Sequence, residues 1–123
     1  MKRYSLFVTA FIIIFFTALQ AQKIAEVDDD MREFVLSATY LQIFEDPAGK
    51  LTIDQVSDSS FQHLFKTNQS NYPYNENVKS AYWIKFKIRN ESKSGKSFLL
   101  ESYAPHTNNW QVYIPVKHGY EMK

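Results

Sequence analysis

Residues 81–90 read Ala-Tyr-Trp-Ile-Lys-Phe-Lys-Ile-Arg-Asn. Apolar side chains at positions 84, 86 and 88 alternate with cations at positions 85, 87 and 89. This period of two predicts one strand over residues 82–89, with an apolar face and a cationic face. Turn-forming residues follow at 90–95, and further strands are predicted at 97–103 and 110–115. We therefore expect an antiparallel sheet whose apolar face needs a cover.

The segment before this sheet is predicted to contain a strand, a turn and one turn of helix. Residues 40–44 are aromatic and β-branched enough for a strand, and Asp46-Pro47 with Gly49 indicates a turn. Thr52 and Gln55 have capping-box spacing, which predicts a helical turn over residues 53–57. The aromatic residues at 61 and 65 fit either an apolar helix face or a short strand. Short strands at this spacing favour an all-β sandwich or barrel.

The N-terminus has the three parts of a secretory signal peptide over residues 1–21. Lys2 and Arg3 precede an apolar stretch at residues 6–19, and Ala21 offers a small residue for cleavage. Because Leu19 suits the cleavage site poorly, an uncleaved anchor is the alternative. Residues 22–37 are acidic and are expected to form a solvated, loosely held arm. The remaining residues, 38–123, form the expected domain, exported to the periplasmic or extracellular face of the inner membrane.

Composition excludes several classes of function. The chain has 14 lysine and arginine residues against 13 aspartate and glutamate residues, and no cysteine. This balance gives no electrostatic reason to bind nucleic acid, and disulfides are impossible. The three histidines are far apart and no phosphate-binding glycine loop is present, so we expect no metal, cofactor or catalytic residue. Glu91 and Glu101 flank a predicted hairpin, but Glu91 falls in a turn and solvated charges explain both.

Aromatic residues are the better candidates for a binding role. Trp83 is predicted on the cationic face beside Lys85, where a flat ring with polar neighbours would suit a sugar. The alternative is that a loop or a second sheet covers Trp83. Tyr72 and Tyr74 lie in a long polar loop that could line a pocket for a small molecule or be an unoccupied surface loop.

The order and spacing of several segments resemble one known family. The segments are Tyr40–Val56 with its Asp-Pro-x-Gly-x-Leu-Thr pattern, Phe61, Ser80–Phe86, Asn90, Leu99–Pro105 and Val112–Pro115. Together they resemble the extracellular type-2 domain of bacterial seven-transmembrane receptors with diverse intracellular signalling modules. Lys85 stands where this family usually has arginine, and Asn108 stands where it tends to have aspartate.

The resemblance implies a jelly-roll sandwich related to carbohydrate-binding modules, with a ligand site that would include Asn108. It implies a sensor of a small solute such as a carbohydrate, followed in full-length relatives by seven membrane helices and a cytoplasmic output module. The family domain is expected to run further, so the chain is expected to be an N-terminal fragment with the 110–115 strand left as an unpaired edge. Alternatives are a carbohydrate-binding module without a signalling role and a domain that binds a protein through its open sheet edge.

Overall fold

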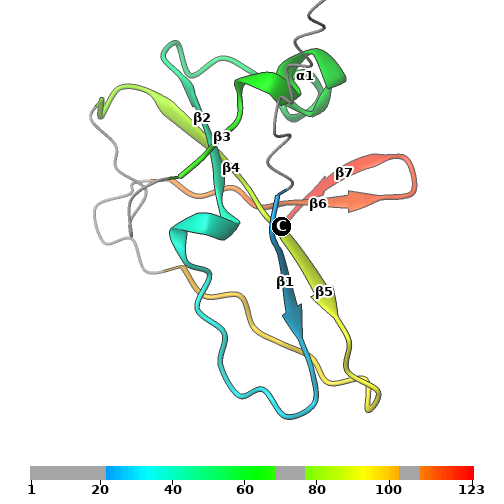
Figure 1. Cartoon of the computed structure of the whole chain (residues 1–123). Helices are drawn as coiled ribbons and strands as arrows, with labels where there is room; N and C mark the ends of the chain where they lie inside the picture. Colours follow the sequence, from blue (N-terminus) through cyan, green and yellow to red (C-terminus); the bar gives the residue numbers. More distant parts are fainter. Residues whose placement is uncertain (1–21, 69–76, 103–108) are drawn as a thin grey trace, which may run out of the picture.

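The computed structural model describes residues 22–68, 77–102 and 109–123 (Figure 1). Within these ranges the strands are β1 (Ile24–Val27), β2 (Gln42–Asp46), β3 (Lys66–Thr67), β4 (Ala81–Lys85), β5 (Lys87–Asn90), β6 (Tyr113–Val116) and β7 (Gly119–Met122). The helices are the α-helix α1 (Ile53–Ser57) and the 3-10 helices η1 (Ala38–Tyr40) and η2 (Ser59–Leu64). The strands are more numerous than these short helices and contain more residues, which confirms the all-β class. The sandwich arrangement stays a prediction.

The central sheet has the strand order β3-β2-β4, and both pairings are antiparallel. Gln42 lies opposite Lys85 and Asp46 lies opposite Ala81, so β4 runs along the whole of β2. Strand β3 is much shorter and lies opposite only Gln42 and Ile43. The last three residues of β2 therefore have a neighbour on the β4 side alone within the described sheet.

The turn after β2 is built around the carboxylate of Asp46. This side chain is buried, at 4% exposure, and accepts main-chain N–H groups from Ala48 at 3.2 Å, Gly49 at 3.0 Å and Leu51 at 2.8 Å. Gly49 has φ +61°, a conformation that glycine adopts without strain. The Asp-Pro-x-Gly-x-Leu pattern is thus explained by turn structure, with the acid closing the turn from inside.

The predicted helical turn is confirmed as α1. The main-chain N–H of Thr52 donates to Gln55 Oε1 at 2.9 Å, and the main-chain N–H of Gln55 donates to Thr52 Oγ1 at 3.4 Å. These reciprocal bonds form a capping box. Val56 is the buried residue of the helix, at 3% exposure. The segment left open by the sequence forms η2, so Phe61 lies within a helical turn and Phe65 directly follows it, and neither occupies a strand.

The predicted single strand over 82–89 is wrong, because the chain changes partners at Phe86. Strand β4 pairs with β2, whereas β5 pairs in parallel with β1. The cause is visible in β2: its partner for Lys85 is Gln42, and residues 38–40 before it form a 3-10 helix that cannot continue the ladder. The alternating residues of this segment are thus divided between two sheets.

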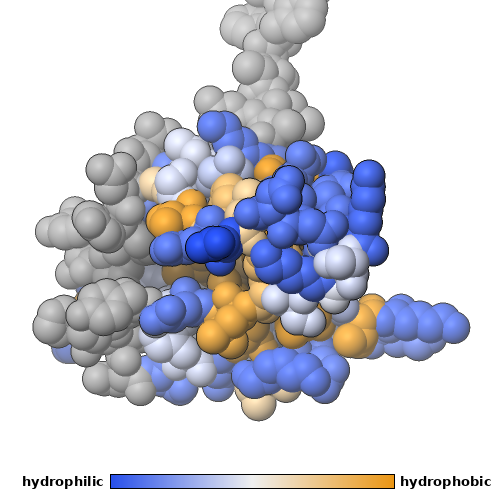
Figure 2. Space-filling view, turned by 90° about the horizontal axis from the view of Figure 1, so that it is seen from below, coloured by the Kyte–Doolittle hydropathy of each residue, from blue (hydrophilic) through white to orange (hydrophobic). Residues whose placement is uncertain are grey.

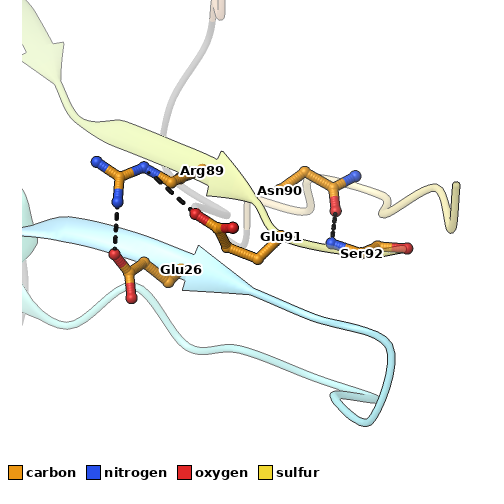
Figure 3. A network of polar contacts seen from close by, with 5 residues as sticks. All are labelled: Glu26, Arg89, Asn90, Glu91 and Ser92. Carbon is orange, nitrogen blue, oxygen red and sulfur yellow. Dashed lines mark hydrogen bonds and ion pairs between the residues drawn. The ribbon is translucent and has the colours of Figure 1, made fainter. Parts of the chain in front are cut away.

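The prediction of a loosely held arm is wrong for residues 24–27, which form β1. Ala25 and Val27 are buried, at 0% and 6% exposure, while the side chains between and beside them face outward. Arg89 of β5 donates to Glu26 Oε1 at 2.9 Å and lies 3.6 Å from Glu91 (Figure 3). The small apolar residues alternate with charged ones, which is the pattern of a half-buried strand.

A polar cluster fastens the segment after β1 to the loop after β5. The Asp29 carboxylate accepts the Ser92 hydroxyl at 2.7 Å, the main-chain N–H of Lys93 at 2.8 Å, and the Ser94 hydroxyl. These bonds, led by the Ser94 and Ser92 hydroxyls, hold the pKa of Asp29 well below its usual range. Lys96 Nζ donates to the Met31 carbonyl at 2.6 Å. We call these residues the Asp29 latch.

The predicted strand at 97–103 is wrong over its described part, since residues 97–102 have no strand structure. Phe98, Leu99 and Leu100 form a consecutive apolar run, which suits a strand buried on both faces. Their exposures of 37%, 92% and 49% show that the described structure buries neither face. Among the described residues, no strand pairs with this segment.

The predicted strand at 110–115 is shifted to β6, and β6 is paired rather than left as an unpaired edge. Strand β7 returns beside it in an antiparallel hairpin, with Tyr113 opposite Met122. Trp110, just before β6, is 48% exposed and so lies outside the core. Apolar side chains lie among polar ones on the face shown in Figure 2, and no large side chain of the described residues is fully buried. The core is therefore thin.

Candidate ligand-binding site

The structure places two of the five predicted site residues together. Trp83 and Lys85 are two positions apart on β4, so their side chains share one face of the central sheet. Tyr72, Tyr74 and Asn108 lie outside the described residues. The candidate site is therefore built from Trp83, Lys85 and the side chains that surround them.

The face that carries Trp83 is largely aromatic, which corrects the expectation of a cationic surface. Trp83 lies opposite Phe44 of β2, and opposite partners share a face. The Phe44 ring lies 6.1 Å from the Phe61 ring and 5.7 Å from the Phe65 ring, measured between centroids. Segment 61–65 thus covers this face, as the alternative reading of Trp83 expected.

Trp83 is half-buried and contacts the C-terminal hairpin. Its ring centroid lies 5.9 Å from that of Tyr113, with the two planes tilted by 31°. Trp83 Nε1 is buried and finds no hydrogen-bond acceptor among residues 22–68, 77–102 and 109–123. A buried N–H without an acceptor costs about 1–3 kcal/mol, so indole N–H groups at such positions usually have a partner. This atom is the most unusual polar group of the face.

Lys85 lies at the edge of the same aromatic cluster. Its Nζ atom is 4.4 Å from the centroid of the Phe65 ring and donates to Gln62 Oε1 at 2.6 Å. Burial lowers the pKa of Lys85, and repulsion from Lys87 adds to the shift. The Lys85 ammonium is thus a half-buried donor with a cation–π contact, rather than one of a row of solvated charges.

Sequence reasoning missed the residues that make this environment. Gln62 and Phe65 fall in a segment whose structure the pattern left open, and Tyr113 is 30 positions from Trp83 in a separate hairpin. The available signals were the aromatic residues at positions 61 and 65 and the Val112–Pro115 segment of the family resemblance, which contains Tyr113. The Trp83–Tyr113 contact is non-local, so no periodicity could reveal it.

Within the described ranges the structure shows neither a candidate metal site nor a candidate membrane-spanning helix. No three histidine, aspartate or glutamate side chains there come together in a group that could hold a metal ion. None of the helices within residues 22–68, 77–102 and 109–123 combines the length and the apolar character needed to cross a membrane.

The comparison with known families agrees with the resemblance in the sequence. Residues 38–123 match the family described as 7TMR-DISM extracellular 2, the extracellular part of seven-transmembrane receptors. No curated protein and no solved structure gives a match. The family match covers well over half of the chain, from η1 through β7. The chain therefore belongs to the 7TMR-DISM extracellular 2 family.

Proposed function

We propose that this domain is a non-catalytic sensor that binds a small solute, with a carbohydrate as the first candidate, at the Trp83 face. In this proposal residues 1–21 export the domain, residues 38–123 bind the solute outside the inner membrane, and full-length relatives pass the signal through seven helices to an output module. Family membership supports the extracellular receptor role. The choice of solute rests on the aromatic site.

The observation that carries the proposal is the enclosed Nε1 of Trp83 beside the Tyr113 ring, an atom that has no acceptor among the residues that the structure describes. Sugars combine apolar C–H faces with hydroxyl oxygens, so one molecule can contact an aromatic ring and accept the indole N–H. Lys85 Nζ and Gln62 supply further polar groups at the same face. The site thus has the mixture of flat aromatic and hydrogen-bonding groups that suits a sugar.

Because Nε1 is enclosed, a ligand can bind to it only if the structure around it changes. A ligand oxygen can reach this atom only when a covering group such as Tyr113 moves, because solvent does not reach it in the described arrangement. Ligand affinity would then differ between the closed arrangement and an opened one. Such differential affinity is what a sensor needs to convert occupancy into a change of state.

The test is a fluorescence titration of the full chain with a panel of mono- and disaccharides, using glycerol as a non-specific control. We expect saturable changes in tryptophan emission for at least one sugar. Trp83→Phe keeps an aromatic ring but removes the indole N–H together with the Trp83 emission, so the affinities of the variants are measured by calorimetry. This variant should bind the sugar about tenfold more weakly, the value of one hydrogen bond to a buried donor. Trp110→Phe is the matched control, since Trp110 is 48% exposed, and should leave affinity unchanged. No saturable response to any sugar, or equal effects of the two variants, would reject the carbohydrate site.

A further inference from the structure

A second feature, separate from the Trp83 face, is a hollow at the side of β2 where β3 ends. It has a volume of about 620 Å³ and is lined by Ile43, Phe44, Glu45, His63, Leu64, Lys66 and Tyr82. Figure 1 shows β3 as a short strand beside β2, with the chain arriving from the α1 region. The hollow therefore lies where the chain passes from η2 into β3.

The open side of β2 exposes main-chain groups to this hollow. The main-chain N–H of Asn68 donates to the Leu41 carbonyl at 3.0 Å, which extends the β2–β3 register by one pair. Residues that bond to a given neighbour alternate along an antiparallel ladder. Leu41 and Ile43 therefore face the β3 side, and Glu45 is the next residue that does so. Because β3 begins at Lys66, opposite Ile43, the N–H and C=O of Glu45 point beyond the end of the ladder.

Two opposite charges stand on the same face at this point. Lys66 is opposite Ile43, and Glu45 is two residues further along β2, so the two side chains are diagonal neighbours about 7–8 Å apart at their bases. Glu45 Oε1 accepts the Ser80 hydroxyl at 2.6 Å, which holds the carboxylate in place. No ion pair joins Glu45 to Lys66 within the part of the chain that the structure describes. The charges thus remain separated, with the apolar side chain of Ile43 between them.

The geometry points to a zwitterion of the amino-acid class, a free amino acid or a dipeptide, as the ligand of this hollow. Its carboxylate would accept from Lys66 Nζ, and its ammonium would donate to the carboxylate and main-chain carbonyl of Glu45. An apolar ligand side chain would lie against Ile43 and Leu64. An anion alone would be repelled by Glu45 and a cation alone by Lys66, whereas a zwitterion matches both.

This inference shares with the proposed function only the idea of a solute sensor, and Glu45 and Lys66 lie on the other face of the sheet from Trp83. Phe44, on the Trp83 face, also lines the hollow. The two sites use different polar groups, Trp83 Nε1 in one and Lys66 and Glu45 in the other, so variants of these groups test them separately.

The experiment is calorimetric titration of the full chain with L-leucine and L-alanyl-L-leucine, supported by amide shifts from nuclear magnetic resonance. We expect saturable binding, with the largest shifts at Glu45 and Lys66. N-acetyl-leucinamide keeps the apolar side chain but lacks both charges, and should bind at least about tenfold more weakly. Equal binding of the capped compound, or no saturable heat and no shifts with either zwitterion, would overturn the assignment.

Matched variants separate the two charges. Lys66→Gln should weaken binding of L-leucine by about tenfold, as should Glu45→Gln, because each removes one charge-assisted contact. Lys87→Gln is the control for the loss of a cation, since Lys87 is an exposed residue of β5. This control should bind L-leucine like the parent chain. An unchanged affinity in Lys66→Gln, with the fold verified by circular dichroism, would also overturn the assignment.

Discussion

Replacing Asp46 with alanine should destabilise the domain by about 2–3 kcal/mol, because the Asp46 carboxylate accepts hydrogen bonds from three main-chain N–H groups. The three bonds are not equal. Gly49 N–H also donates to the main-chain carbonyl of Asp46 at 3.1 Å, and Ala48 is exposed, so both groups keep a partner or reach water in the variant. Leu51 is half-buried and has the shortest bond, at 2.8 Å. The expected cost is therefore that of one hydrogen bond to a charged acceptor, because the half-buried N–H of Leu51 loses its partner.

Asp46→Asn sharpens this prediction. Its amide oxygen can still accept Ala48 and Gly49, but its NH₂ group would face the Leu51 N–H, so donor would meet donor. We expect it to lose about 2 kcal/mol, most of the alanine effect. Asp30→Ala is the matched control, because Asp30 is an exposed acid of the same charge outside this turn. Urea unfolding followed by far-ultraviolet circular dichroism gives the free energies, provided the m-value stays constant. If Asp46→Ala unfolds within about 0.5 kcal/mol of Asp30→Ala, the carboxylate does not hold the turn.

Three further outcomes are expected. Thr52→Ala removes one half of the capping box and should cost about 1 kcal/mol in urea unfolding, whereas Thr39→Ala, with an exposed side chain, should cost less. Gly49→Ala should cost about 1–2 kcal/mol from its positive φ alone, since the added Cβ would meet Ala81 Cβ at an ordinary 3.9 Å, and Gly49→Asn should cost less. Because the pKa of Asp29 is lowered in the folded chain, the Asp29 latch stabilises the fold fully above the unfolded value of about 3.9 and loses this contribution as pH falls below it. Asp29→Asn should remove that acid dependence between about pH 4 and pH 2, and an unchanged pH profile would contradict the role given to the latch.

Local signals in the sequence were sufficient for local structure. The turn at Asp46–Gly49 and the capping box of Thr52 each involve residues within five positions of one another, so side-chain chemistry alone specifies them. Strand β2 and the all-β class follow from the same kind of signal. The family pattern around residues 46–51 is a turn motif. Such a motif can be identified from the sequence because it depends on few residues in fixed spacing.

Partner choice was beyond the sequence. The alternation over residues 82–89 correctly indicates strand structure, although all four residues of β5 are exposed, and a period of two says nothing about which strand lies alongside. At Phe86 the chain changes neighbours. Lys85 pairs with Gln42 of the antiparallel strand β2, 43 positions earlier, whereas β5 pairs with the parallel strand β1, which begins at Ile24. For the same reason the candidate site was only half predicted: Trp83 and Lys85 were found from their own strand, while Tyr113 and Gln62 belong to elements placed by tertiary packing.

The pairing of β1 shows why acidic composition was misleading. Of its four residues only Ala25 and Val27 are buried, and both side chains are small, so apolar burial contributes little to holding the strand. The remaining attachment is the main-chain pairing of β1 with β5 together with polar side-chain contacts: Glu26 with Arg89, and the Asp29 latch with Ser92 and Lys93. Acids that resemble a solvated tail in the sequence therefore help to fasten this segment to β5. Since β5 continues directly from β4, the N-terminal strand is attached to the same stretch of chain that carries Trp83 and Lys85.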